Sequence, residues 1–188
     1  NIVLTFNETV QAGTGNITLF KSDNTQVEVF DVTTDVTVSG ATVTLDPAAD
    51  LDSLQGYYVQ VASTAVKDTS NNSYAGISDT TTLSFTAADI AGPTLASSTP
   101  ADDATGIAVN SNIVLTFNET VQAGTGNITL FKSDNTSVEV FDVTTDVTVS
   151  GATVTLDPAS DLDSLQGYYV KVESTAVKDT SNNAYAGI

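Results

Sequence analysis

Short runs of alternating apolar and polar residues follow one another along the whole chain. Val, Ile, Leu, Thr, Tyr and Phe fill these runs, and clusters of Gly, Asn, Asp and Ser separate them every 8–12 residues or so. No segment of useful length has the periodicity of an amphipathic helix. The pattern predicts an all-β fold of the sandwich type. In the first part of the chain we expect strands at Asn1–Phe6, Asn16–Lys21, Val27–Val32, Asp35–Ser39, Ala41–Asp46, Gly56–Ala62 and Thr81–Ala87.

The pattern recurs because the sequence itself recurs. Residues 1–77 return at residues 112–188, an offset of 111. A period of this length is too long for a solenoid repeat and fits a whole small domain. We therefore expect two tandem domains with the same strands, and an opening strand of the second near Thr94–Ser98. The copies differ at five positions: Gln26/Ser137, Ala49/Ser160, Gln60/Lys171, Ala62/Glu173 and Ser73/Ala184.

Residues 78–111 occur only once, between the two copies. Their first part, SDTTTLSFTAADI, is expected to close the first domain, and the remainder to open the second. This predicts one domain over residues 1–90 that lacks its opening strand, and another over residues 91–188 that lacks its closing strand. The chain is then cut from a longer array, or a partner completes each domain by strand exchange.

Two differences between the copies identify the outer face of one strand. Gln60/Lys171 and Ala62/Glu173 lie two positions apart, and side chains two apart share a face. This face must meet solvent, because burying an unpaired Lys and Glu costs several kcal/mol. The alternate residues are therefore expected in the core: Tyr57, Val59 and Val61.

Three further segments predict local structure. Ser39–Gly40 is typical of a two-residue hairpin turn. The DVTTDV segment (Asp31–Val36) indicates a bend or bulge where an edge strand changes sheets. The LDSLQGYYV segment (Leu51–Val59) has the spacing of a tyrosine corner, in which Tyr57 hydrogen-bonds the backbone; the alternative is an aromatic ring that is simply packed.

The charge of the chain excludes several classes of partner. It carries 23 acidic residues against five lysines and no arginine, a formal net charge of −18. Such a chain repels nucleic acid and anionic membranes and attracts divalent cations. No apolar run approaches the ~20 residues of a membrane-spanning helix. We expect no nucleic-acid partner and no membrane insertion.

The side chains that are missing argue against catalysis. The chain has no His and no Cys, so neither a Ser–His–Asp triad nor a Cys–His pair can form. Paired carboxylates remain chemically possible, but no pattern places two of them in an apolar cleft. We expect that the protein is not an enzyme.

An ordered set of motifs covers essentially the whole repeat: PTLASSTPADDATGIAVNSNIVLTFNETV (Pro93–Val121), GYYVKV (Gly167–Val172) and AVKDTSNNAYAG (Ala176–Gly187). With these motifs the chain resembles the bacterial immunoglobulin-like domains that are strung in series in surface-layer proteins and giant adhesins. The resemblance implies tandem Ig-like β-sandwiches with Greek-key connections and about seven strands each. It also implies export to the cell surface or beyond, with neighbouring repeats as the partners of each domain. It implies no ligand.

An Ig-like topology gathers oxygen ligands at one end of the second domain. The loop with Glu119 and the loop with Asp179 and Asn183 meet there, and the preceding segment brings Asp89. Hard oxygen ligands suit Ca²⁺, which takes six to eight of them. We predict a calcium site formed by these four residues that stiffens the junction, opposite the first domain's Asp46, Asp50 and Asp52. The alternative is that Asp and Asn are only turn formers with solvated charges.

Three functions fit these observations. The leading one is an extracellular spacer or stalk in a large adhesin-like protein, because reach and repetition need near-identical copies. A second is a filament subunit that self-assembles by strand exchange. A third is a carbohydrate-binding adhesin module, although the chain has no Trp and its loops offer only Tyr74 and Tyr185 for stacking on sugar.

Overall fold

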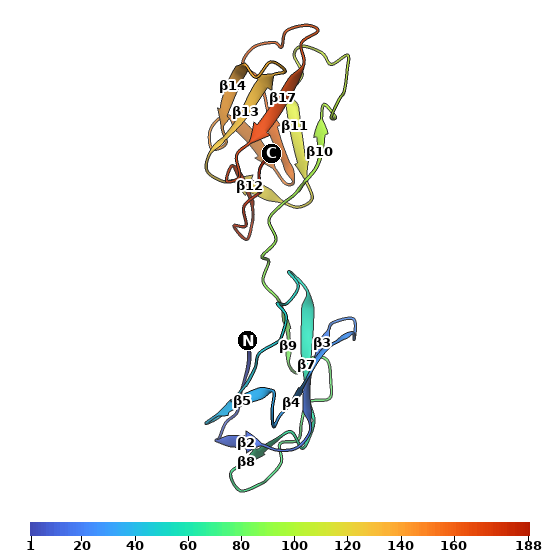
Figure 1. The fold of residues 1–188 in the computed structure, drawn as a ribbon, viewed down its shortest axis with the longest axis vertical. Coiled ribbons are helices and arrows are strands. Elements are labelled where there is room, and N and C mark those ends of the chain that lie inside the picture. Colours follow the sequence, from blue (N-terminus) through green and yellow to red (C-terminus); the bar gives the residue numbers. More distant parts are fainter. The chain divides into compact units, whose positions relative to one another are not determined.

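The computed structural model describes residues 1–188, and the chain divides into two compact units (Figure 1). Unit 1 is Asn1–Ala88 and unit 2 is Asp89–Ile188. Each consists of β-strands joined by turns. The structure has no helix with the length and apolar character needed to cross a bilayer.

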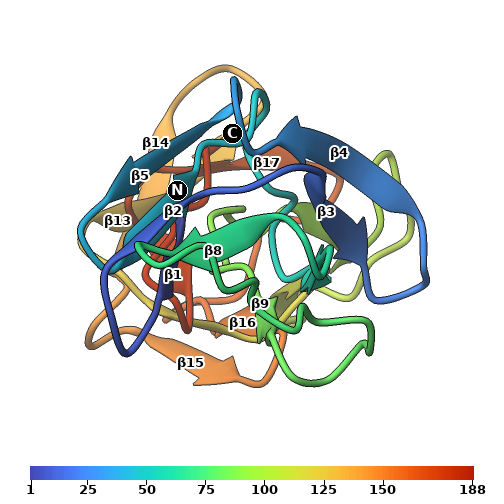
Figure 2. The same cartoon turned by 90° about the horizontal axis from the view of Figure 1, so that it is seen from below.

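Unit 1 has nine strands in three sheets. The larger sheets have the strand orders β4-β3-β7-β9 and β1-β6-β5, and β2 pairs with β8 in a small third sheet. All pairings are antiparallel, and Figure 2 shows β3 and β4 running side by side. The strands are β1 (Ile2–Thr5), β2 (Val10–Ala12), β3 (Asn16–Lys21), β4 (Gln26–Asp31), β5 (Val36–Ser39), β6 (Thr42–Leu45), β7 (Gly56–Val61), β8 (Val66–Asp68) and β9 (Ser84–Thr86).

Unit 2 repeats this architecture with a different strand at each sheet edge. Its sheets have the orders β14-β13-β17, β10-β11-β16-β15 and β12-β18. Thus β10 pairs with β11, whereas no named strand pairs with the equivalent edge of β1. Likewise β9 pairs with β7, whereas at the equivalent edge of β17 Val172 exchanges backbone hydrogen bonds with Ile188, both at 3.0 Å. The strands are β10 (Leu95–Thr99), β11 (Ile113–Phe117), β12 (Val121–Ala123), β13 (Asn127–Lys132), β14 (Ser137–Asp142), β15 (Val147–Ser150), β16 (Thr153–Leu156), β17 (Tyr168–Val172) and β18 (Val177–Asp179).

The two larger sheets of each unit bury one apolar core between them. In unit 1, Val43 and Leu45 of β6 face Ile17 and Leu19 of β3, and all four side chains are fully buried. Strands that are adjacent in a sheet are often distant in sequence, as with β1 and β6 or β3 and β7, so the chain crosses repeatedly between the sheets. The predicted all-β fold of tandem Ig-like sandwiches is confirmed.

The predicted strands all exist, and their ends lie within three residues of the predicted ends. The sequence pattern missed the pair β2 and β8 and its equivalent, β12 and β18, because three residues are too few to show an alternation. These short pairs raise the number of strands per unit from the expected seven or so to nine.

The predicted hairpin turn is displaced by one residue. Ser39 pairs with Thr42, so the two connecting residues are Gly40 and Ala41 rather than Ser39–Gly40. Gly40 has φ +57° at the first of these positions, a conformation that glycine adopts without steric cost.

The DVTTDV segment changes sheets, as predicted. β4 ends at Asp31 in one large sheet, and β5 begins at Val36 in the other. The Asp31 carboxylate accepts a hydrogen bond from the Thr33 amide at 2.8 Å, and the Asp35 carboxylate accepts one from the Asp31 amide at 2.9 Å. The two aspartates thus satisfy backbone donors at the corner.

Tyr57 behaves as a corner tyrosine. Its hydroxyl accepts a hydrogen bond from the backbone amide of Asp52 at 2.9 Å, and Tyr168 does the same for Asp163 at 2.8 Å. The hydroxyl group of Tyr57 is therefore hydrogen-bonded to the backbone, and the residue is not merely a packed aromatic ring. This is the tyrosine corner that the spacing predicted.

The predicted outer face of β7 and β17 is also confirmed. Lys171 and Glu173 are exposed, and Val59 and Val61 are buried. Tyr58 lies on the outer face but is only 4% exposed, because its ring stacks on Phe20 with the centroids 5.0 Å apart.

Candidate metal centre

The segment before β10 is attached to the body of unit 2 by backbone and side-chain contacts. The Thr94 amide donates to Asn118 Oδ1 at 2.7 Å, and the Asn118 amide donates back to the Thr94 carbonyl at 3.0 Å. Gly92 lies so close to Ala184 that an added Cβ would come within 2.3 Å of the Ala184 carbonyl oxygen. These contacts position Asp89 at the start of the segment.

The other two carboxylates come from turns at the same end of unit 2. Glu119 lies between β11 and β12, and Asp179 is the last residue of β18. Because β12 pairs with β18, with Val121 opposite Asp179, the ladder brings the Glu119 turn beside the end of β18. Gln122 strengthens this pairing by donating from Nε2 to the Asp179 carbonyl at 2.6 Å.

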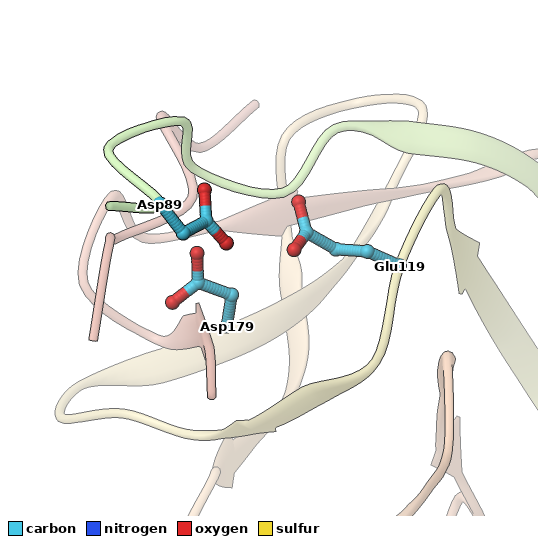
Figure 3. A group of neighbouring side chains, drawn as sticks. All are labelled: Asp89, Glu119 and Asp179. Atoms are coloured by element: carbon cyan, nitrogen blue, oxygen red, sulfur yellow. The ribbon is translucent and has the colours of Figure 1, made fainter. Parts of the chain in front are cut away.

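Three carboxylates converge at this point. Asp89, Glu119 and Asp179 each offer one oxygen, and these oxygens lie within 4.8 Å of one another. Figure 3 shows the three carboxylates turned toward a common space. Asp179 is fully buried, while Asp89 and Glu119 are partly exposed. The sequence prediction that these three residues meet is therefore matched by their placement.

Asn183 orients two members of the cluster. Its backbone amide donates to Asp179 Oδ1 and its Nδ2 donates to Asp179 Oδ2, both at 2.8 Å. The same Nδ2 donates to the backbone carbonyl of Asp89 at 3.1 Å. Asn183 thus holds the buried carboxylate in place and ties the opening segment to it.

Asp179 is kept ionised despite its burial. Burial acts to raise the pKa of this carboxyl, but hydrogen bonds from Asn183 and from the amides of Ser181 and Asn182 outweigh it and lower the pKa. A buried negative charge therefore persists at neutral pH.

Glu119 has the opposite shift. Burial, followed by the negative charges of Asp89 and Asp179, raises the pKa of the Glu119 carboxyl above its ordinary value. The ionised cluster is thus electrostatically unfavourable as it stands, and a bound cation would reverse the sign of this interaction.

This donor set fits a hard cation. Three carboxylates supply up to six oxygens without nitrogen or sulfur, which suits Ca²⁺ with its six to eight oxygen ligands. Water completes such a shell where the protein leaves it open, and the partly exposed Asp89 and Glu119 leave it open here.

Comparison with unit 1 shows which features of the cluster belong to the loop after β18 itself. Its equivalent residues Asp68 and Asn72 make the same two hydrogen bonds, each at 2.7 Å. The Asp–Asn pair is therefore a property of the loop itself, as the turn-former alternative holds. The equivalent Glu8 is exposed. In unit 2 the carboxylate of Asp89 joins those of Glu119 and Asp179.

The sequence did not identify two contributors, Gln122 and Ser181. Ser181 Oγ donates to Asp89 Oδ2 at 3.4 Å, and Gln122 supports the Asp179 backbone. The asparagines of the DTSNN segment (residues 179–183) indicated a turn. Nothing in the sequence pattern indicated that a nearby serine or glutamine would contact the carboxylates.

The other acidic and aromatic candidates lie elsewhere. Asp52 of unit 1 forms an ion pair with Lys21 at 2.7 Å, and Asp46 and Asp50 are exposed beside it in sequence. Tyr185 is 5% exposed and makes an edge contact with Phe117, with the ring centroids 5.2 Å apart. Tyr74 makes the same contact with Phe6 in unit 1 at 5.3 Å and is partly exposed.

Comparison with known proteins identifies the fold at the level of sequence. No curated protein matches the chain significantly. The profile of a family described as "Bacterial Ig-like domain" matches residues 1–87 and, a second time, residues 89–188. The two matches coincide closely with the two compact units. The chain belongs to the bacterial Ig-like domain family, as two tandem members of it.

Proposed function

We propose that this chain is an extracellular structural module: tandem Ig-like spacer repeats in the stalk of a large cell-surface or secreted adhesin-like protein. Domains of this family commonly occur as repeated modules of surface or extracellular proteins and generally have structural or binding roles. A spacer needs length, solubility and independent folding, and it needs no ligand.

The observation that carries this proposal is the pattern of variation between the units. None of the five differing positions is buried in either copy, so the two cores are identical and even the surfaces have hardly diverged. Two modules kept alike on every face suit a role in which only repetition matters.

Self-assembly by strand exchange is less favourable for this chain. β9 and β10 are each present once and are already paired within their own units. Exchanging either strand between two copies replaces one pairing with an identical one and adds no contact, while association costs translational and rotational entropy. The spacer proposal therefore predicts a monomer.

Two measurements test the spacer against its alternatives. Sedimentation equilibrium should give the mass of one chain over a wide concentration range, and the chain should pass unretained through immobilised polysaccharides. Mass that grows with concentration would instead support the filament subunit. Retention that free sugar reverses would support the adhesin module.

We further propose that Ca²⁺ binds unit 2 through Asp89, Glu119 and Asp179, with Asn183 orienting Asp179 and the Asp89 backbone. Support comes from the convergence of the three carboxylates and from the raised pKa of Glu119. The role of the ion would be to fix the opening segment on the unit that follows it.

Isothermal titration calorimetry of the full chain, after treatment with EDTA, tests the calcium proposal. We expect about one ion per chain, loss of this binding in D89N, and unchanged binding in E8Q, the equivalent of Glu119 in unit 1. Absence of binding heat, together with a melting temperature that calcium does not raise over EDTA, would overturn it.

A further inference from the structure

The hairpin turns after β3 and β13 differ at one chemically informative position. Gln26 of unit 1 is replaced by Ser137 in unit 2. The triplet that begins at Asn24 is therefore NTQ, whereas the triplet that begins at Asn135 is NTS. Only the second has the form Asn-x-Ser/Thr, which is the acceptor sequence for N-linked glycosylation in exported proteins.

The loops after β8 and β18 differ in the same way but in the opposite sense. Ser73 of unit 1 is replaced by Ala184 in unit 2, so the triplet at Asn71 is NNS and the triplet at Asn182 is NNA. Two of the five differences between the copies thus decide whether a turn asparagine is an acceptor. Each unit has one such acceptor that the other unit lacks.

Both acceptor asparagines lie in fully exposed turns. Asn135 has φ +69° and Asn71 has φ +67°, a left-handed conformation that Asn adopts more readily than most residues with a side chain. Residues 133–137 and 69–73 are all exposed. An enzyme can therefore reach each complete triplet without opening the sandwich.

The amide nitrogen of each acceptor is free to react. Asn135 Oδ1 accepts a hydrogen bond from the Tyr169 hydroxyl at 2.8 Å, and Asn71 Oδ1 accepts one from Gln11 Nε2 at 3.3 Å. These bonds use the oxygen of each side-chain amide, and neither Nδ2 donates a hydrogen bond within the chain. By contrast, the Nδ2 of the neighbouring Asn72 is occupied by a carboxylate at 2.7 Å.

The fold hides other triplets of the same form. The NIT triplets begin at Asn16 and Asn127, the first residues of β3 and β13. Their middle residues, Ile17 and Ile128, are both 0% exposed, and each strand is paired on both sides. A transferase could bind such a triplet only after the strand had separated from its neighbours. The structure therefore distinguishes accessible acceptors from hidden ones.

We propose that Asn135 of unit 2 and Asn71 of unit 1 are acceptor sites for N-linked glycans. The donor is a sugar linked to a lipid pyrophosphate. Asn Nδ2 attacks the anomeric carbon of the sugar, the bond from that carbon to the phosphate oxygen breaks, and the lipid pyrophosphate leaves. Nδ2 loses one proton to a base of the transferase, and nothing is oxidised or reduced. The proposal rests on the export that the spacer role also requires.

Transfer to the folded full chain tests the accessibility of the sites. The chain is incubated with a purified oligosaccharyltransferase and a lipid-linked oligosaccharide, and glycopeptide mass spectrometry assigns each modified asparagine. Asn135 and Asn71 should gain glycans. Asn24 and Asn182, which lack the hydroxyl at the third position, should stay unmodified, and so should Asn127, which is hidden in β13.

The two units supply matched substitutions. S137Q should abolish modification of Asn135. Q26S should create a site at Asn24, where φ is +71° and the Tyr58 hydroxyl donates to Oδ1 at 3.0 Å, as at the equivalent turn. A synthetic peptide of residues 122–132 should be modified at Asn127, because no fold hides it. Acceptance of this peptide without modification of Asn135 in the folded chain would overturn the proposal, and so would modification of Asn127 in the folded chain.

Glycopeptide analysis of the protein isolated from the cells that produce it tests whether the glycans are attached there. We expect glycopeptides that contain Asn135 and Asn71. Recovery of the chain outside the cells without glycans would overturn the glycan proposal and leave the spacer role intact. Recovery of the chain only inside the cells would overturn the export on which both proposals rest.

Discussion

The side-chain amide of Asn183 donates a hydrogen bond to the backbone carbonyl of Asp89, 94 residues earlier in the chain, at 3.1 Å. The same nitrogen also holds the buried carboxylate of Asp179. One side chain therefore couples the opening segment of unit 2 to the loop after β18. Several consequences of this coupling can be measured against unit 1, which carries an equivalent loop.

Replacing Asn183 with alanine should loosen the opening segment. N183A removes both Nδ2 hydrogen bonds and leaves the buried Asp179 carboxylate with fewer donors, so the melting temperature of unit 2 should fall by several degrees. Amide exchange around Asp89 should accelerate, and calcium affinity should fall about 10–100-fold. N72A in unit 1 is the control, because Asn72 makes the equivalent hydrogen bonds to Asp68 and belongs to the unit that does not contain Asp89. Equal effects of the two substitutions on exchange near Asp89 would contradict this account.

The ionised Glu119 carboxylate should destabilise the fold without calcium and stabilise it when calcium binds. Its pKa is raised in the folded state, so the folded protein binds this proton more readily than the unfolded chain does. Without calcium, E119Q should therefore raise the melting temperature at neutral pH. This gain should shrink as the pH falls through the raised pKa and vanish below the ordinary glutamate value.

In the presence of calcium the order of the two melting temperatures should invert. E119Q then lacks a ligand for the ion and should melt at a lower temperature than the wild type. E8Q should be neutral in both conditions. If E119Q were destabilising in EDTA at neutral pH, the carboxylates would not repel one another as the geometry implies.

Gly92 provides a test of how closely the opening segment must approach. A Cβ at this position would lie 2.3 Å from the carbonyl oxygen of Ala184, which is backbone and cannot rotate away. G92A should therefore displace the segment and weaken calcium binding by about 10–100-fold. A91S, at the exposed neighbouring position, should bind normally in the same titration. Normal binding by G92A would mean that Asp89 does not depend on this contact.

The two corner tyrosines allow one substitution to be compared in two environments. Y57F removes the hydrogen bond from the Asp52 amide at a site that is 2% exposed, so it should destabilise unit 1 by about 1 kcal/mol. Y168F should cost less, because Tyr168 is partly exposed and water can reach the freed amide. Calorimetric unfolding of the two variants measures both costs. A larger cost for Y168F than for Y57F would contradict this dependence on burial.

The sequence determined the strands where the alternation was long enough to read. β3 has the predicted bounds, Asn16–Lys21, and the charges at 171 and 173 set the face of β17 correctly. The three-residue strands β2 and β8 gave no such signal, and the hairpin turn was displaced because the Ser39–Thr42 pairing depends on register across the sheet.

The candidate site was predictable to the extent that topology alone brings loops together. Asp89, Glu119 and Asp179 meet as expected from the order of strands in an Ig-like unit. The orienting role of Asn183 could not be read from spacing, because it depends on the direction of a side-chain amide. The contact of Gly92 with Ala184 depends likewise on tertiary packing.

The measurement that tests the central claim most directly is force-induced unfolding of single chains, with and without calcium. Independent spacer modules should unfold in two steps. The fully extended chains released in the two steps should differ in contour length by about 40 Å, because unit 2 has 100 residues (89–188) against 88 in unit 1 (1–88), at roughly 3.3–3.6 Å per extended residue. Calcium should raise the force of the longer step alone. A single step for the whole chain would contradict the modular spacer, and a calcium effect on the shorter step would contradict the site in unit 2.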